Sequence, residues 1–241
     1  MLKLSLLLGT IAALADVAGA LVLVKARIGQ RYLRYFVALG AGFLMATSVL
    51  EMLPESLKLD AKLAPVLVMA GYCALHFLEH TIVPHFHFGE ETHHHEFMSA
   101  HTSYSVLGGL AVHALFDGVA IGSGFAINSL LGWLIFLAIF LHKAPEGFTM
   151  ASVMLASGSS RRTALFSAVA LAAATLAGVL VIELAPQMVR YGLPVSAGVA
   201  LYVAATDLVP EVNREPGVKM ALVFFAGVAG FLLLRMLIPT S

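Results

Sequence analysis

Charge and cysteine are both scarce in this chain. Only 12% of its 241 residues are Asp, Glu, Lys or Arg, and the formal net charge at pH 7 is zero. Because domains that bind nucleic acids usually carry a basic surface, this balance gives no indication of a nucleic acid partner. The single cysteine, Cys73, excludes both an internal disulfide and a CxxC metal motif.

Hydrophobic residues make up 60% of the chain, and the mean hydropathy is +0.92. A bilayer core roughly 30 Å thick needs about 20 apolar residues per helix. We expect eight such helices, over residues 4–24, 34–53, 63–83, 104–126, 130–156, 162–184, 190–209 and 218–238. Their short connections leave no room for a soluble domain, so the sequence predicts an all-α membrane protein with residues 1–241 as a single transmembrane domain.

The first apolar run resembles a secretory signal, with Ala18-Gly19-Ala20 as a cleavage site. However, the run continues through Leu21–Val24, and most of the nearby positive charge follows it rather than precedes it. This asymmetry favours an uncleaved helix with its N-terminus outside. The distribution of Lys and Arg over the later loops agrees with that orientation. We therefore expect a multi-pass protein of the plasma (inner) membrane.

A histidine-rich connection follows the third predicted helix, and the expected orientation places it in the cytoplasm. Its imidazoles alternate with Glu90, Glu91 and Glu96. Such a run is suited to a loose zinc site, and equally to a loop that only keeps the segment soluble. The candidate ligands of this loop, residues 85–101, are His85, His87, His93, His94, His95 and His101.

Two short segments repeat one pattern. Glu51-Met-Leu-Pro54-Glu55 lies near the outer end of the second predicted helix, and Asp207-Leu-Val-Pro-Glu211 lies near the inner end of the seventh. These two helices run in opposite directions, and inverted repeats are typical of transporters whose substrate site lies between the halves. The sequence therefore predicts an inverted arrangement of three, two and three helices.

The fourth and fifth predicted helices each carry a histidine and an acid at i,i+4 spacing. These pairs are His113 with Asp117 and His142 with Glu146, and each pair shares one helix face near mid-membrane. Ionisable groups are expensive at that depth, which makes them functional candidates. Together they form a ligand set for Zn²⁺, with Fe²⁺ and Mn²⁺ as other ions. The alternative is a polar cluster that only joins two helices.

These motifs resemble those of the ZIP (Zrt/Irt-like) metal transporters, of the bacterial type. The fourth helix of that family typically reads His-Asn-x-x-Asp/Glu-Gly, and the fifth His/Gln-x-x-Pro-Glu-Gly. Here they read His113-Ala-Leu-Phe-Asp117-Gly and His142-Lys-Ala-Pro-Glu146-Gly. The resemblance implies uptake of a divalent metal into the cytoplasm through a site that bridges these two helices. We expect zinc as the transported ion, with Fe²⁺, Mn²⁺ and Cd²⁺ as further candidates.

The sequence departs from the family pattern around a second, adjacent metal position. Ala114 and Lys143 stand where relatives often carry an Asn and an acid, and the sixth helix offers no clear carboxylate. An unpaired ammonium at the midplane is costly, so we expect either a carboxylate close to Lys143 or a depressed pKa of its ammonium. The alternative is that Lys143 points away from the core and extends towards the membrane surface. The hypothesis is a single-metal core with Lys143 as a built-in counter-ion at the second site.

Other polar residues outline a route for the metal. Glu51 and Glu55 are candidates for an outer entrance, and solvated helix ends are the alternative. Asp16, in the first helix, is either a pore residue or a helix–helix partner. The candidates for an inner exit towards the histidine-rich loop are His76, Glu79, His80, Asp207 and Glu211.

The sequence thus predicts a secondary transporter rather than an enzyme, with the metal ion and the lipid bilayer as partners and a homodimer as the assembly to test. Two other functions stay open. An intramembrane metallohydrolase would need HExxH or an equivalent, which HKAPE lacks. A membrane metal sensor would bind the ion without moving it.

Overall fold

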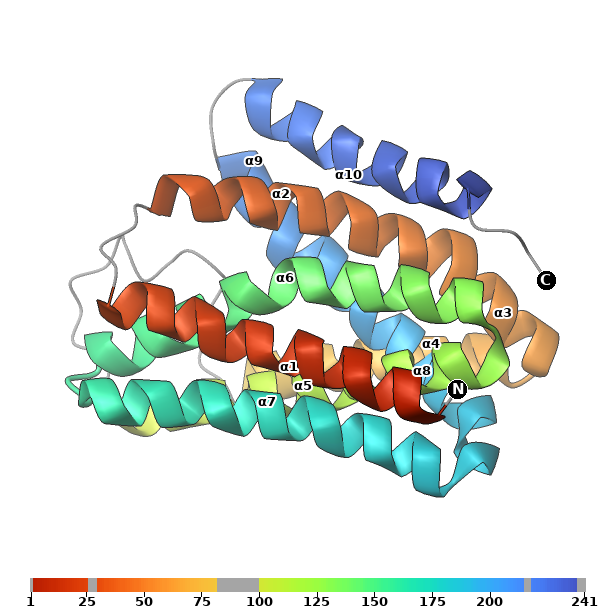
Figure 1. Cartoon of the computed structure of the whole chain (residues 1–241), viewed down its shortest axis with the longest axis horizontal. Helices are drawn as coiled ribbons and strands as arrows, with labels where there is room; N and C mark the ends of the chain where they lie inside the picture. Colours follow the sequence, from red (N-terminus) through yellow and green to blue (C-terminus); the bar gives the residue numbers. More distant parts are fainter. Residues whose placement is uncertain (1, 26–29, 82–99, 215–217, 238–241) are drawn as a thin grey trace.

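The computed structural model describes the whole chain except residues 1, 26–29, 82–99, 215–217 and 238–241. Its described residues form helices and turns, with no strand. Eight long helices lie roughly side by side in one bundle (Figure 1). The elements are α1 (Leu2–Lys25), α2 (Gln30–Thr47), η1 (Ser48–Met52), α3 (Leu53–Leu59), α4 (Ala64–Thr81), α5 (Ala100–Ile127), α6 (Ser129–Ala156), α7 (Arg161–Leu184), η3 (Pro186–Met188), α8 (Val189–Tyr202), η4 (Val203–Leu208), α9 (Val209–Arg214) and α10 (Val218–Leu237).

Seven helical segments of the described chain are long and apolar enough to cross a membrane. The eighth long helix, α4, matches the predicted span 63–83 but is not among these seven, and its last turns carry His76, Glu79 and His80. Large apolar side chains are exposed on several helices, including Phe77 of α4 and Phe225 of α10. Such exposure suits a surface in contact with lipid. The all-α, multi-pass membrane architecture is therefore confirmed.

Two predicted helix ends were wrong. The second span continues past residue 53 to Leu59, and the seventh continues past residue 209 to Arg214. In both, a π-helical turn precedes the proline: Leu53 N–H bonds to the carbonyl of Ser48, and Val209 N–H bonds to that of Ala204. Proline has no backbone N–H group, and the first turn of a helical segment does not need one. The helix can therefore continue after the wider turn.

The repeated acid-x-x-Pro-Glu segments have the same structure. Glu51 lies in the π-helical turn η1 and Asp207 lies in η4, and each is followed by a short α-helix that begins next to the proline. The helices that carry them, α2 and α8, run in opposite directions through the bundle (Figure 1). The repeat read from the sequence is therefore also a repeat of local structure.

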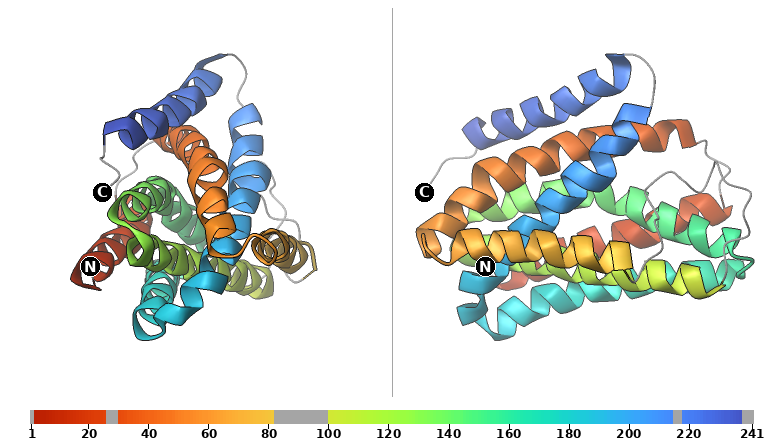
Figure 2. Two further views of the ribbon diagram at one scale, coloured as in Figure 1. Left: turned by 90° about the vertical axis from the view of Figure 1, so that its right-hand side faces the viewer. Right: turned by 180° about the vertical axis from the view of Figure 1, so that it is seen from behind.

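Glycine contacts between helices repeat in the same inverted manner. At the crossing of α2 and α10, a Cβ on Gly42 would lie 2.0 Å from the carbonyl oxygen of Phe224. At the crossing of α8 and α4, a Cβ on Gly198 would lie 1.9 Å from that of Val68. Gly42 and Gly198 are separated by the same number of residues as Glu51 and Asp207. The pair formed by α2 and α10 and the pair formed by α8 and α4 are thus built alike, and Figure 2 shows where these helices lie.

The two helices that carry the central motifs take part in the other matched pair of crossings. A Cβ on Gly118 of α5 would lie 1.9 Å from the carbonyl oxygen of Thr175 in α7. A Cβ on Gly147 of α6 would lie 1.9 Å from the carbonyl oxygen of Asp16 in α1. Small residues allow such close backbone approach in membrane helices. In each helix the glycine at the crossing is the residue directly after the acid of the motif, Asp117 or Glu146. This matched arrangement confirms the predicted inverted repeat.

The turn between α3 and α4 is held by Asp60. Its carboxylate accepts hydrogen bonds from the backbone N–H groups of Leu63 at 3.0 Å and Lys62 at 3.1 Å, and it also binds the Arg190 guanidinium of α8. The Arg190 guanidinium, followed by the backbone donors, holds the pKa of this carboxyl below its usual value. This contact ties the start of α4 to α8.

Candidate metal centre

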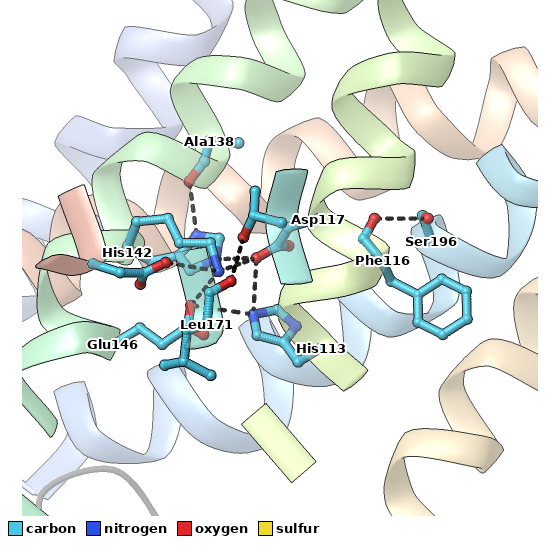
Figure 3. Close-up of polar contacts among 11 residues, drawn as sticks. His113, Phe116, Asp117, Ala138, His142, Glu146, Leu171 and Ser196 are labelled. Carbon is cyan, nitrogen blue, oxygen red and sulfur yellow. Dashed lines mark hydrogen bonds and ion pairs between the residues drawn. The ribbon is translucent and has the colours of Figure 1, made fainter. Parts of the chain in front are cut away.

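The central residues of α5 and α6 meet inside the bundle. His113, Asp117, His142 and Glu146 are all buried, and each can offer one ligand atom so that the four atoms lie within 4.8 Å of one another. Their side chains converge between the two helices (Figure 3). The structure therefore brings together all four residues that the sequence selected for the core, and their role as metal ligands stays a prediction.

The separations within this cluster match the size of a small divalent cation. The Oδ2 atom of Asp117 lies 3.2 Å from Nε2 of His113 and 3.3 Å from Nε2 of His142. Nε2 of His113 lies 3.9 Å from Oε2 of Glu146. Zinc bonds of about 2.0–2.1 Å in tetrahedral geometry put neighbouring ligand atoms about 3.3 Å apart. The cluster needs only a small adjustment to hold such an ion.

Backbone contacts orient the cluster. Nδ1 of His142 lies 2.9 Å from the carbonyl oxygen of Ala138, which accepts its hydrogen when the ring carries the proton there (Figure 3). That tautomer leaves Nε2 with a free lone pair directed at the cluster, as metal-binding histidines require. Next to Asp117, the hydroxyl of Ser196 in α8 donates to the carbonyl of Phe116 at 2.9 Å and so fixes α8 against α5.

Lys143 is fully buried beside the same carboxylates. Its Nζ lies 2.7 Å from Oε2 of Glu146 and 3.0 Å from Oδ2 of Asp117. This is the close carboxylate that the cost of a buried ammonium predicts. Lysine thus occupies the space next to the cluster, on the side of Asp117 and Glu146, and its function as a counter-ion stays a prediction.

The second metal position contains no further donor from α7. The hydroxyl of Thr175 donates to the carbonyl of Leu171 in its own helix at 3.2 Å. The α7 carboxylate, Glu183, accepts a hydrogen bond from Ser5 of α1. Ala114 is buried and has no donor atom. The structure agrees with the absence of a sixth-helix carboxylate from the core.

Sequence reasoning left Asp16 undecided, and the structure puts it beside the core. Its carboxylate is fully buried, with Oδ2 3.7 Å from Nζ of Lys143. No i,i+4 pattern could have found this contact, because Asp16 lies on α1 and Lys143 on α6. The signal available in the sequence was only that an acid stood in an otherwise apolar helix.

The two entrance candidates both have basic partners. Glu51 is buried, and its carboxylate forms an ion pair with the guanidinium of Arg235 in α10. Glu55 pairs with Lys58 at 2.5 Å, one turn further along α3. The pairing of Glu51 with Arg235 was not foreseen, because Arg235 lies in the last helix and nothing local connects the two.

Only some of the exit candidates lie close to one another. On α4, the rings of His76 and His80 lie 4.1 Å apart, and the ring of Tyr202 is 5.8 Å from that of His76. Glu79 is partly buried on the same helix, and Asp207 is buried in η4. Glu211 instead contacts Arg214 at 3.3 Å. An exit through this region stays a prediction.

The loop candidates lie outside the described residues. These are His85, His87, His93, His94 and His95. His101 falls in the first turn of α5, but its side chain is likewise not described. A metal site in the loop therefore stays a prediction.

The sequence of this chain is similar to those of known zinc transporters. Residues 90–237 match the family model described as ZIP Zinc transporter. The human zinc transporter ZIP4 is 31% identical over 132 residues, which cover 54% of this chain and 20% of that protein. The human zinc transporter ZIP10 is 31% identical over 122 residues, covering 49% of this chain and 15% of that protein. The zinc transporter zipt-7.1 of Caenorhabditis briggsae is 30% identical over 107 residues, 42% of this chain and 27% of that protein.

Proposed function

Because this chain belongs to the ZIP zinc transporter family, we propose that it carries zinc across the membrane into the cytoplasm. The observation that supports this most directly is the buried cluster of two imidazoles and two carboxylates between α5 and α6. Buried groups of this kind in a membrane helix pair suit a dehydrated divalent cation. Their metal-ligating atoms come from His113, Asp117, His142 and Glu146.

We further propose that the core holds one metal ion at a time. The ammonium of Lys143 lies within 3.0 Å of both Asp117 and Glu146, where a second ion would need the same oxygens. A fixed positive charge there repels a second divalent ion and weakens the binding of the first. Weaker binding favours release over trapping, which a transporter requires.

The inverted repeat suggests how the two ends of the route differ. The offset that relates Glu51 to Asp207 also relates Glu79 to Arg235. At the outer end Glu51 is paired with the Arg235 guanidinium, whereas the residue near Asp207 that is equivalent to Arg235 is an acid, Glu79. Two acids attract a divalent cation more strongly than an acid already paired with a base. This difference supports entry near Glu51 and Glu55 and exit past His76, Glu79, His80, Asp207 and Glu211.

The proposed topology places the N-terminus outside, in the plasma (inner) membrane, with residues 1–241 acting as one transmembrane domain. The histidine-rich loop then faces the cytoplasm, where we propose that it receives or senses the released ion. We propose a secondary transporter without catalytic activity, for which Fe²⁺, Mn²⁺ and Cd²⁺ are candidate alternative ions. A homodimer is the assembly to test by size-exclusion chromatography with light scattering.

Flux into vesicles tests the proposal. The purified full chain, reconstituted into liposomes that contain a zinc-sensitive dye, should admit zinc faster than protein-free vesicles. Competing Fe²⁺, Mn²⁺ and Cd²⁺ in the outer solution should slow the signal in the order of their affinity. Binding without flux would support a metal sensor, and cleavage of a membrane peptide would support a hydrolase.

Replacing Lys143 by aspartate is expected to let a second metal ion bind at the core. The substitution removes the positive charge next to Asp117 and Glu146 and adds a carboxylate that can reach the vacated position. The measurement is the number of zinc ions per protein by equilibrium dialysis, which should rise by one relative to the unmodified chain. An unchanged number, in a variant that elutes as a monodisperse protein, would argue against the counter-ion role.

A further inference from the structure

Asp16 is a buried carboxylate outside the four-residue core. It lies in α1 with none of its surface exposed, and neither of its oxygens has a hydrogen-bond partner among the described residues. The nearest positive charge is the ammonium of Lys143, 3.7 Å from Oδ2. Burying an ionised carboxylate is costly unless an opposite charge compensates it. The ionised carboxylate of Asp16 therefore depends on the ammonium of Lys143.

The position of Asp16 is fixed where α1 and α6 cross with their backbones in contact. A Cβ on Gly147 would lie 1.9 Å from the Asp16 carbonyl oxygen, and a Cβ on Gly19 would lie 1.9 Å from that of Ala144. The backbones of α1 and α6 therefore touch directly on either side of the Asp16–Lys143 contact. Neither residue can move far without separating the two helices, so the side chains have only a short distance to adjust.

Metal and lysine compete for the same oxygens. Lys143 contacts Oδ2 of Asp117 and Oε2 of Glu146, and these atoms also face the two histidines. A divalent ion bound about 2 Å from those oxygens repels the ammonium. It also neutralises the carboxylate charge that otherwise stabilises the ammonium. Among the described residues, Asp16 is then the one further carboxylate in ion-pair contact with Lys143.

The charges of the group balance only when Asp16 is included. Three carboxylates and one ammonium, with both imidazoles neutral, leave two negative charges in excess. One divalent ion neutralises them. Without Asp16 the loaded core would carry one uncompensated positive charge in a buried site, where charges interact strongly.

We propose that Asp16 is the charge-balancing residue of the central site: it holds Lys143 while a single divalent cation occupies the carboxylates of α5 and α6. The proposal rests on the proposed metal site and adds a positioning residue from α1 to it. It also explains why the missing carboxylate of α7 is not needed. At the equivalent crossing, where Gly118 meets the carbonyl of Thr175, Ala114 stands in the place of Lys143 and Thr175 stands in the place of Asp16.

The test is a double-mutant cycle in which the zinc affinity of the purified full chain is measured in detergent. Zinc that a His142→Ala, Glu146→Ala variant still binds is subtracted as binding elsewhere. Asp16→Asn should weaken zinc binding at the core roughly 100-fold, because Lys143 then opposes the metal without compensation. Lys143→Met should tighten it. The combination of Asp16→Asn with Lys143→Met should bind at least as tightly as the unmodified chain.

Thr175→Val is the matched control, because it removes a polar group at the equivalent position of α7 and should leave zinc affinity unchanged within about 3-fold, less than a typical lost interaction. Unchanged affinity in Asp16→Asn would overturn the proposal. So would a double variant that stays as weak as Asp16→Asn, since a merely structural defect is not repaired by removing Lys143. Because affinity is measured without flux, a chain that binds zinc but does not transport it would reject the transport function and leave this test intact.

Discussion

Zinc flux into proteoliposomes is expected to fall to the level of protein-free vesicles when His142 and Glu146 are both replaced by alanine. The two residues supply half of the proposed ligand atoms, and both come from α6. With them removed, Asp117 and His113 cannot complete a four-ligand shell, and the ion would have to leave water for a site that replaces too few of its bonds. The measurement is the initial rate of dye response at equal protein content.

The control for this variant is Glu183→Ala, which removes a carboxyl of α7 outside the core. Glu183 is bonded to Ser5 of α1, so this variant should retain most of the flux. Both proteins must elute as monodisperse species before their rates are compared. Flux at the unmodified rate in the His142→Ala, Glu146→Ala variant would show that zinc takes another path.

The second large effect is expected at a glycine. Replacing Gly118 by alanine puts a Cβ 1.9 Å from the carbonyl oxygen of Thr175, which is backbone and cannot rotate away. The helices α5 and α7 must separate, and overpacking of this severity costs about 3 kcal/mol. For a chain of this size the midpoint of thermal unfolding in detergent should fall by roughly 10 °C.

Gly108 provides the matched control in the same helix. An alanine there has no atom within 4 Å to meet, so Gly108→Ala should leave the midpoint unchanged or raise it slightly through the higher helix propensity of alanine. Equal midpoints for Gly118→Ala and Gly108→Ala would mean that the α5–α7 crossing is looser than the structure indicates. A lower midpoint for Gly118→Ala alone supports the close approach.

Local patterns in the sequence were enough to predict the fold class and the core residues. Hydropathy depends on each segment alone, so the long helices could be located, and the i,i+4 spacing put His113 with Asp117 and His142 with Glu146 on single helix faces. The repeated acid-x-x-Pro-Glu segments also indicated the inverted arrangement. The ends of the second and seventh helices were missed, because a π-helical turn before Pro54 or Pro210 leaves no mark in the hydrophobic pattern.

Contacts between distant helices were decided only by the tertiary structure. The sequence by itself favoured a carboxylate near Lys143, but the packing of α1 on α6 is what adds Asp16 to Asp117 and Glu146. In the same way, Arg235 reaches Glu51 only because α10 lies along α2. The physical reason is that burial makes any suitably placed opposite charge a partner, whereas its place along the chain depends on how the helices pack. The four residues that gather at the core could therefore be named from the sequence, whereas the set of carboxylates around Lys143 was decided by the fold.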